Sequence, residues 1–64
     1  MAMQRRDFIQ RIEQAGWSLV REGGSHSIYG KRGRTFPVPR HNDVKRGIVK
    51  AWEKLNKQID EEDE

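Results

Sequence analysis

The chain has 64 residues and no cysteine, so it is long enough for one small domain and excludes disulfide scaffolds and thiolate metal sites. Apolar residues make up 33% of it and charged residues 36%, which leaves a thin core for a chain expected to bury only about 60% of its unfolded surface. No apolar run approaches membrane-spanning length, and no signal-peptide pattern opens the chain. We therefore expect a soluble, cytoplasmic protein that does not associate with membranes.

The net charge of +3 is unevenly distributed along the chain. All five residues from Asp60 to Glu64 are acidic, and the other 59 residues carry 13 basic and 5 acidic side chains, a net charge of +8. A body this basic attracts phosphate backbones, which predicts a nucleic-acid partner; a generic solvated basic surface is the alternative. We expect a domain over residues 1–59 followed by a disordered acidic tail over residues 60–64. The alternative is that the tail folds back onto the basic surface and inhibits the protein.

The first element is an amphipathic helix predicted over residues 3–15. Its apolar residues fall at spacings of one, three and four and form one stripe: Phe8, Ile9, Ile12 and Ala15. Gly16 is expected to end the helix, because glycine adopts the left-handed conformation that closes helix C-termini.

Three β-type runs follow the helix. Residues 17–22 alternate and predict the first strand, and Gly23-Gly24 predicts a hairpin turn into a second strand over residues 25–30. After the basic turn at residues 31–34, a short third strand is expected over residues 35–38. Pro37 and Pro39 have no N–H to donate, so this third strand should lie at an edge of the sheet or end early.

Alternation along the second strand places His26 and Ile28 on one face and Ser27 and Tyr29 on the other. Trp17 and Trp52 are expected to pack in the core, and base stacking is the alternative. Tyr29 is expected to pack on a neighbouring side chain, and proton donation is the alternative.

A second helix is expected to begin near Val44, with Asn42 or Asp43 as its cap, and to continue to Ile59. Its apolar stripe is Val44, Ile48, Val49, Trp52, Leu55 and Ile59. Gly47 has a low helix propensity, so it should lie near the first turn or permit the close approach of another backbone or a phosphate. The element order α-β-β-β-α predicts an α+β fold with a three-stranded antiparallel sheet, both helices on one face, and the opposite face largely uncovered.

His26 is the strongest candidate for chemistry. Histidine titrates near neutral pH, and this one lies at the edge of a strand beside a turn, with cations near it in sequence or hairpin register: Lys31, Arg32, Arg34 and Arg40. Metal-free RNA cleavage needs a base for the 2′-hydroxyl proton, an acid for the leaving oxygen, and cations for the phosphate charge. A surface histidine in a tight hairpin is the structural alternative. The two histidines and scattered carboxylates lack the spacing of a metal site, so no metal and no cofactor are expected.

Three segments together resemble the HicA family of toxins. They are Gly16-Trp17, Gly24-Ser25-His26-Ser27-Ile28-Tyr29 and Val38-Pro39-Arg40-His41, within a resemblance that spans roughly residues 4–59. The resemblance implies a double-stranded-RNA-binding-domain-like fold and an mRNA-cleaving ribonuclease, with His26 as the catalytic histidine. It also implies a HicB-type antitoxin protein that binds the toxin and blocks its active site in a hetero-oligomer. The acidic tail is not part of the family pattern.

Further residues are assigned around His26. The predicted RNA contacts are Lys31, Arg32, Arg34, Arg40, His41, Lys45 and Arg46. Gly24 and Ser25 are expected to support the turn, and the Ser25 side chain should diverge from His26 because neighbouring strand residues face opposite ways, which argues against a serine nucleophile. His41 has two interpretations: a second acid–base group or phosphate contact, or a structural residue of the loop.

Two other classes of function fit the same features. A non-enzymatic RNA-binding module would share the charge, helices and strands, and only the Gly24-Ser25-His26 segment and the resemblance favour an enzyme. A protein that binds only another, acidic protein is the third possibility, and a steep salt dependence of RNA binding would count against it.

Overall fold

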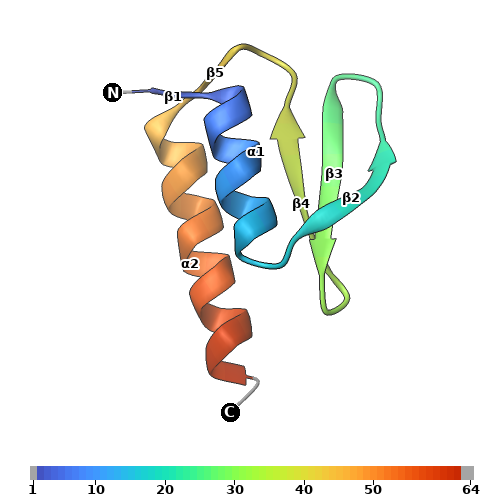
Figure 1. The fold of residues 1–64 in the computed structure, drawn as a ribbon, viewed down its shortest axis with the longest axis vertical. Helices are drawn as coiled ribbons and strands as arrows, with labels where there is room; N and C mark the ends of the chain where they lie inside the picture. Colours follow the sequence, from blue (N-terminus) through green and yellow to red (C-terminus); the bar gives the residue numbers. More distant parts are fainter. Residues whose placement is uncertain (1, 63–64) are drawn as a thin grey trace.

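A computed structural model describes residues 2–62 of the chain. Its element order contains the expected helix, three strands and helix, with an additional two-residue strand before each helix (Figure 1). The elements are β1 (Met3–Gln4), α1 (Arg5–Gln14), β2 (Ser18–Glu22), β3 (His26–Lys31), β4 (Arg34–Pro39), β5 (Asp43–Val44) and α2 (Arg46–Glu62).

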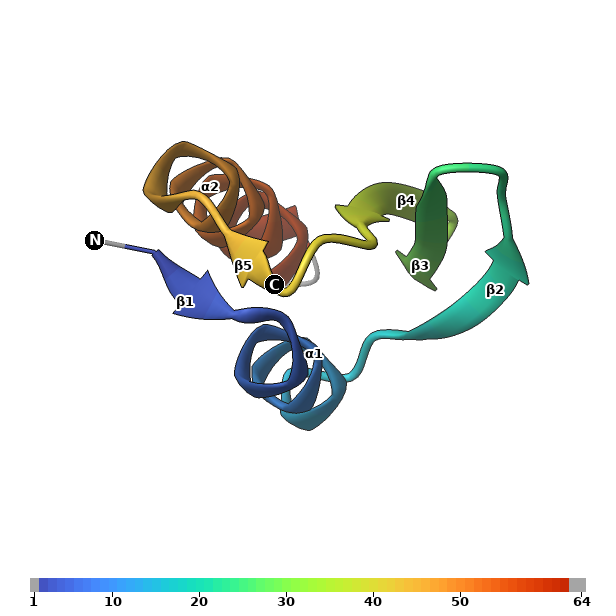
Figure 2. The same ribbon diagram turned by 90° about the horizontal axis from the view of Figure 1, so that it is seen from above.

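The main sheet has the strand order β2-β3-β4, with both pairs antiparallel. Both helices lie on the same side of this sheet (Figure 2), which confirms the predicted α+β arrangement. As expected from its prolines, β4 is an edge strand: Pro37 lies opposite Ile28, Pro39 lies opposite His26, and no described strand pairs with the outer side of β4.

The short strands β1 and β5 form a second, two-stranded antiparallel sheet that the sequence did not predict. Met3 pairs with Val44, so α1 begins at Arg5 rather than at residue 3. The expected cap of the second helix is wrong as well, because Asp43 lies in β5 and the Asn42 carbonyl accepts a 2.7 Å hydrogen bond from the Arg5 N–H.

The C-terminus of α1 ends at glycine as expected. Gly16 has a φ of 97°, and its N–H donates to the Glu13 carbonyl at 3.0 Å. The Trp17 N–H donates to the Ile12 carbonyl at 3.0 Å, which completes a Schellman motif. Trp17 is thereby turned into the core, where it is 2% exposed.

The core lies between the two helices and the sheet. Its buried residues are Phe8, Ile12, Trp17, Tyr29, Val38, Val44, Val49, Trp52 and Ile59. The Trp17 and Trp52 rings meet edge to face with centroids 6.3 Å apart, so the prediction that both tryptophans belong to the core is confirmed. The Trp17 indole N–H donates to Asn56 Oδ1 at 2.9 Å and thereby ties the start of β2 to α2.

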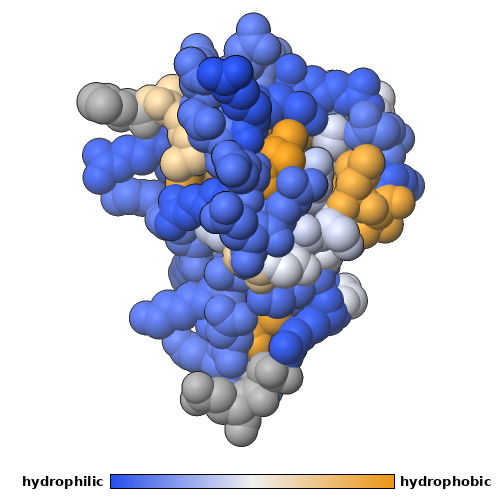
Figure 3. All heavy atoms as spheres, in the orientation of Figure 1, coloured by the Kyte–Doolittle hydropathy of each residue, from blue (hydrophilic) through white to orange (hydrophobic). Residues whose placement is uncertain are grey.

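Strand β2 is exposed along its whole length. Leu19 is 50% exposed and Val20 is 58% exposed, and Figure 3 shows apolar atoms gathered on the surface over β2. The register with β3 shifts between Leu19 and Arg21, so the simple alternation expected for this strand does not hold.

Helix α2 continues to Glu62, three residues beyond the expected end of the domain. The first three residues of the expected disordered tail are therefore helical here, and residues 63 and 64 lie outside the described part of the chain. Asp60 pairs with Lys31 at 3.2 Å and Glu62 pairs with Arg34 at 2.8 Å. Across residues 2–62, neither helix combines the length and apolar character needed to cross a bilayer.

Candidate functional site

His26 is the first residue of β3 and is exposed at the end of the β2–β3 turn (Figure 1). Its neighbour Ser27 is 1% exposed, and Tyr29 is 6% exposed, so these two residues face the helices. Side chains alternate along a strand, so His26 and Ile28 lie on the face that the helices leave open. The predicted orientation of His26 is confirmed.

Gly23 shapes the turn that presents His26. Its N–H donates to the His26 carbonyl at 2.7 Å, and a Cβ atom at Gly23 would stand 2.9 Å from that same oxygen. A Cβ atom at Gly24 would meet nothing within 4 Å. The tight constraint in this turn therefore lies at Gly23, one residue before the glycine that the sequence analysis assigned to turn support.

Ser25 lies against the His26 ring. Its Oγ is 3.2 Å from His26 Nδ1. The expectation that the two side chains diverge is wrong, because Ser25 precedes β3 and does not follow the alternation of the strand. With Nδ1 bonded to the serine hydroxyl, Nε2 is the ring nitrogen directed away from this contact.

Arg40 is the predicted cation that the fold brings to the turn. It follows Pro39, the residue opposite His26, and its guanidinium donates to the Gly23 carbonyl at 2.7 Å. The same group lies 3.5 Å from a carboxylate oxygen of Glu22, with both side chains substantially exposed. Arg40 thereby joins the end of β4 to the β2–β3 turn.

Arg5 supports this end of the sheet from the helix side, and the sequence analysis did not assign it. Its Nε donates to the Pro39 carbonyl and a terminal nitrogen donates to Ser27 Oγ, each at 2.9 Å. A serine on the buried face of a strand needs a hydrogen-bond partner, and that requirement is the signal that could have pointed to a nearby donor.

Lys31, Arg32 and Arg34 lie at the opposite end of β3 from His26. A strand rises about 3.3 Å per residue, which separates the positions of His26 and Lys31 by roughly 17 Å. These three cations are near His26 in sequence but not in space, because an extended strand carries residues close in sequence far apart.

Two of these cations hold other parts of the fold. Lys31 Nζ donates to the Ala15 carbonyl at 2.6 Å as well as to Asp60, and Arg34 binds both carboxylate oxygens of Glu62 at 2.8 and 2.9 Å. Arg32 has a φ of 53° and Gly33 a φ of 80°, as in a type I′ hairpin turn.

His41, Lys45 and Arg46 are exposed between β4 and the first turn of α2. Within residues 2–62, no hydrogen bond or ion pair joins His41 to His26. The Lys45 carbonyl accepts the Ile48 and Val49 N–H groups at 3.0 and 3.2 Å, so its role visible in the fold is to start α2.

The comparison with protein families gives one match. The sequence profile described as the HicA toxin of bacterial toxin–antitoxin systems matches residues 5–59. The chain belongs to the HicA toxin family. A search of curated proteins and a search of solved structures each found no significant match.

The family match stops before the acidic end of this HicA chain. The matched region begins at Arg5, the first residue of α1, and ends at Ile59, the last buried residue of α2. The pairs that Asp60 and Glu62 form with Lys31 and Arg34 therefore come from residues after the matched region.

Tyr29 of the HicA chain lies on the helix-facing side of the sheet, opposite to His26. Burial raises the pKa of its phenol, Glu13 and Glu22 raise it further, and Arg5 opposes them. The packing interpretation of Tyr29 is confirmed by its place in the core.

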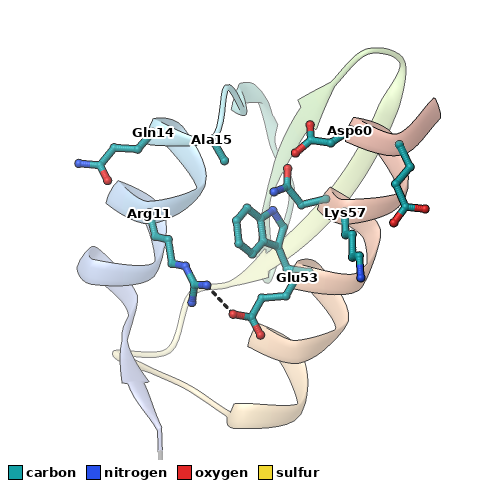
Figure 4. A pocket seen from close by; sticks show the side chains of 9 residues that line it. Arg11, Gln14, Ala15, Glu53, Lys57 and Asp60 are labelled. Carbon is teal, nitrogen blue, oxygen red and sulfur yellow. Dashed lines mark hydrogen bonds and ion pairs between the residues drawn. The ribbon is translucent and has the colours of Figure 1, made fainter. Parts of the chain in front are cut away.

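A groove lies between α1 and α2 of the HicA chain, lined by the last turns of α1 and the second half of α2. Figure 4 shows Arg11 reaching across it to Glu53, with which it forms an ion pair. Among the described residues no three His, Cys, Asp or Glu side chains come together in a group able to hold a metal ion.

Proposed function

We propose that this HicA toxin is a metal-independent endoribonuclease that cleaves mRNA in the cytoplasm and so blocks translation. His26 serves as the general acid or base. The observation that carries the proposal is the exposed His26 ring, whose Nδ1 lies 3.2 Å from Ser25 Oγ, at the end of an uncovered sheet face where Arg40 bonds the Gly23 carbonyl of the adjoining turn.

The proposed reaction uses the RNA itself as the nucleophile. The ribose 2′ oxygen attacks the adjacent phosphorus, and the bond from phosphorus to the 5′ oxygen of the next nucleotide breaks. One proton leaves the 2′ hydroxyl and one is added to the departing oxygen; His26 carries out one of these transfers through Nε2. A positioned histidine contributes about 10²–10⁴-fold to such a step. DNA lacks the 2′ hydroxyl, so it is not a substrate.

Arg40 is the cation proposed to bind the reacting phosphate. Its pair with Glu22 is exposed on both sides, and exposed pairs of this kind are worth only about 0–1 kcal/mol. A phosphate can therefore replace the carboxylate at little cost, while the bond to the Gly23 carbonyl keeps the guanidinium beside the turn. His41, Lys45 and Arg46 are exposed and are proposed to contact the RNA backbone farther from the reacting group.

A HicB-type antitoxin is the proposed protein partner, and it would form a hetero-oligomer with the toxin that covers His26. Two features support a protein partner: β2 is an edge strand with an unpaired outer side among the described residues, and it exposes Leu19 and Val20. Exposed apolar side chains on an open strand edge favour association with another chain.

The test is cleavage of a long unstructured mRNA in excess EDTA by the parent protein and by His26→Ala. We expect cleavage by the parent and its loss in the variant, with the RNA dissociation constant unchanged. Equal cleavage by both proteins would show that His26 is not catalytic.

The same experiment separates the two other classes of function. If neither protein cleaves but both bind RNA with equal affinity, the chain is an RNA-binding module. The exposed Lys45 and Arg46 would then contact the RNA backbone. If RNA binding is absent or independent of salt, the chain binds only other proteins.

A further inference from the structure

Arg5 makes three hydrogen bonds to the segments that surround His26. Its side chain bonds to the Pro39 carbonyl and to Ser27 Oγ, each at 2.9 Å, and its backbone N–H bonds to the Asn42 carbonyl at 2.7 Å. Ser27 follows His26 in β3, and Pro39 lies opposite His26 in β4. Arg5, at the start of α1, therefore bonds to three segments: the residue after His26 in β3, the residue opposite His26 in β4, and the loop after Arg40.

The Pro39 contact closes a gap in the hydrogen bonding of the sheet. The His26 carbonyl accepts from Gly23, so the backbone of His26 is directed toward β2. In an antiparallel pair the backbone groups of directly opposite residues point either toward each other or away from each other. Those of His26 point away from β4, so the carbonyl of its opposite residue Pro39 points to the outer edge of β4, where no described strand pairs. Proline has no N–H to add at this position, and the Arg5 side chain is the donor that bonds the Pro39 carbonyl and joins it to α1.

The Ser27 end of the second contact is buried. Ser27 is 1% exposed, and a buried hydroxyl without a partner is costly. The planar guanidinium supplies two donors in fixed relative directions, which allows one side chain to reach Ser27 on β3 and Pro39 on β4 together; a lysine ammonium has no such fork.

We propose that Arg5 is a positioning residue that holds His26 in the geometry required for RNA cleavage, and that it acts through Ser27 and Pro39 rather than by binding RNA. This inference rests on the proposed function. A displacement of a catalytic group by about 1 Å can cost about 10²-fold in rate, so loss of the two contacts should reduce kcat far more than KM.

The test compares Arg5→Gln with Arg6→Gln. Both variants remove one positive charge from the first turn of α1, but Arg6 is exposed and its side chain makes no hydrogen bond or ion pair within the described residues. We expect Arg5→Gln to lower kcat about 10- to 100-fold, with KM, RNA affinity and its salt dependence matching those of Arg6→Gln. Arg5→Lys should recover part of kcat, since it restores the charge and an ammonium group that can bond one of the two oxygens.

A stability control excludes general loosening of the fold. Ile12→Val removes one methylene from the fully buried core and should destabilise the protein while leaving kcat near that of the parent. If Arg5→Gln does not fold, Ser27→Ala replaces it, because this change removes one of the two contacts without altering the charge; kcat should fall with KM unchanged.

Two results would overturn the proposal. A rise in KM and in the RNA dissociation constant specific to Arg5→Gln, with a smaller salt dependence and unchanged kcat, would show that Arg5 binds RNA phosphate. Equal kcat for Arg5→Gln and Arg6→Gln would show that Arg5 does not position His26.

A second readout is independent of cleavage. NMR signals of the His26 imidazole should broaden or shift in Arg5→Gln and remain as in the parent in Arg6→Gln. If the parent protein does not cleave RNA, the proposed function fails, and the imidazole signals still decide whether Arg5 fixes His26: unchanged signals in Arg5→Gln overturn the inference.

Discussion

At the scale of single residues, the neighbouring glycines of the β2–β3 turn have different roles. A methyl group at Gly23 would press on the His26 carbonyl, at 2.9 Å, whereas one at Gly24 would enter open space, and neither glycine has a positive φ. We expect Gly23→Ala to destabilise the protein by about 1–3 kcal/mol and to reduce RNA cleavage. Gly24→Ala should be neutral or stabilise by up to about 1 kcal/mol.

Urea denaturation and RNA cleavage of both glycine variants check this prediction. Gly24→Ala is the matched control, since it adds the same methyl group one residue away. Equal losses of stability in the two variants would mean that the turn responds to the lost flexibility of glycine and not to the contact with His26.

Tyr29 makes the stability of the protein sensitive to alkali. Its pKa is raised above the ordinary value of 10.0, chiefly by burial. The neutral phenol is therefore favoured in the folded state, and no stability is lost below the unfolded pKa. As the pH rises above about 10, the unfolded chain releases this proton first and the free energy of unfolding falls until the folded phenol also ionises.

Tyr29→Phe should remove this part of the alkaline loss. At pH 7 the variant should cleave RNA at the parental rate, because residue 29 faces the core on the opposite side of the sheet from His26. Urea midpoints of both proteins between about pH 9 and 11 give the comparison. Parallel declines of the urea midpoint in the two proteins would contradict the assignment to Tyr29. The lysines also titrate in this pH range, but they affect both proteins equally.

At the scale of elements, acidic side chains at the end of α2 pair with basic side chains at the β3–β4 turn. Glu62 holds Arg34 with two hydrogen bonds, whereas its neighbour Glu61 has no ion pair within the described residues. Glu62→Gln should lower stability by less than about 1 kcal/mol, since the pair is exposed, and the loss should disappear at high salt. By releasing Arg34, it should also tighten RNA binding at low salt.

Glu61→Gln is the control for this change, because it removes the same charge from the same helical turn. Filter binding of RNA across a salt titration measures the difference between the two variants. Equal affinities would show that the Glu62–Arg34 pair does not compete with RNA. Any increase in affinity over the parent would then come from the change in net charge alone.

The same elements show how much could be predicted from the sequence. Alternation in β3 correctly placed His26 on the face opposite Ser27 and Tyr29, because a period of two is a local property. The helix stripes identified most of the core for the same reason. Strands β1 and β5 are too short to carry an alternation signal, and their pairing depends on residues about 40 positions apart, such as Met3 and Val44.

The candidate site was predictable only in part. The hairpin register explains why Arg40 lies near His26, since Pro39 is opposite His26. The partners of Lys31, which are the Ala15 carbonyl and Asp60, come from two distant elements, and no local pattern indicates them. Arg5 was missed for the same reason: its contacts cross from α1 to β3 and β4.

At the scale of the whole molecule, the arrangement separates two tasks. One end of the sheet carries the exposed His26 and Arg40 and is joined to α1 by Arg5, and the other end is tied to the helices through Lys31 and Arg34. A chain of 64 residues has a small core. The contacts of Lys31 and Arg34 with the helices therefore help to hold the exposed end of the sheet in place.

The buried tryptophan pair has a consequence for spectroscopy. The chain has two tryptophans, and Trp17 and Trp52 are each 2% exposed, with their rings in contact inside the core. The intrinsic fluorescence of the protein therefore originates in the interior, away from the open sheet face. Its emission maximum should shift to longer wavelength when the chain unfolds and should change little when RNA binds, so one optical signal follows folding without interference from the substrate.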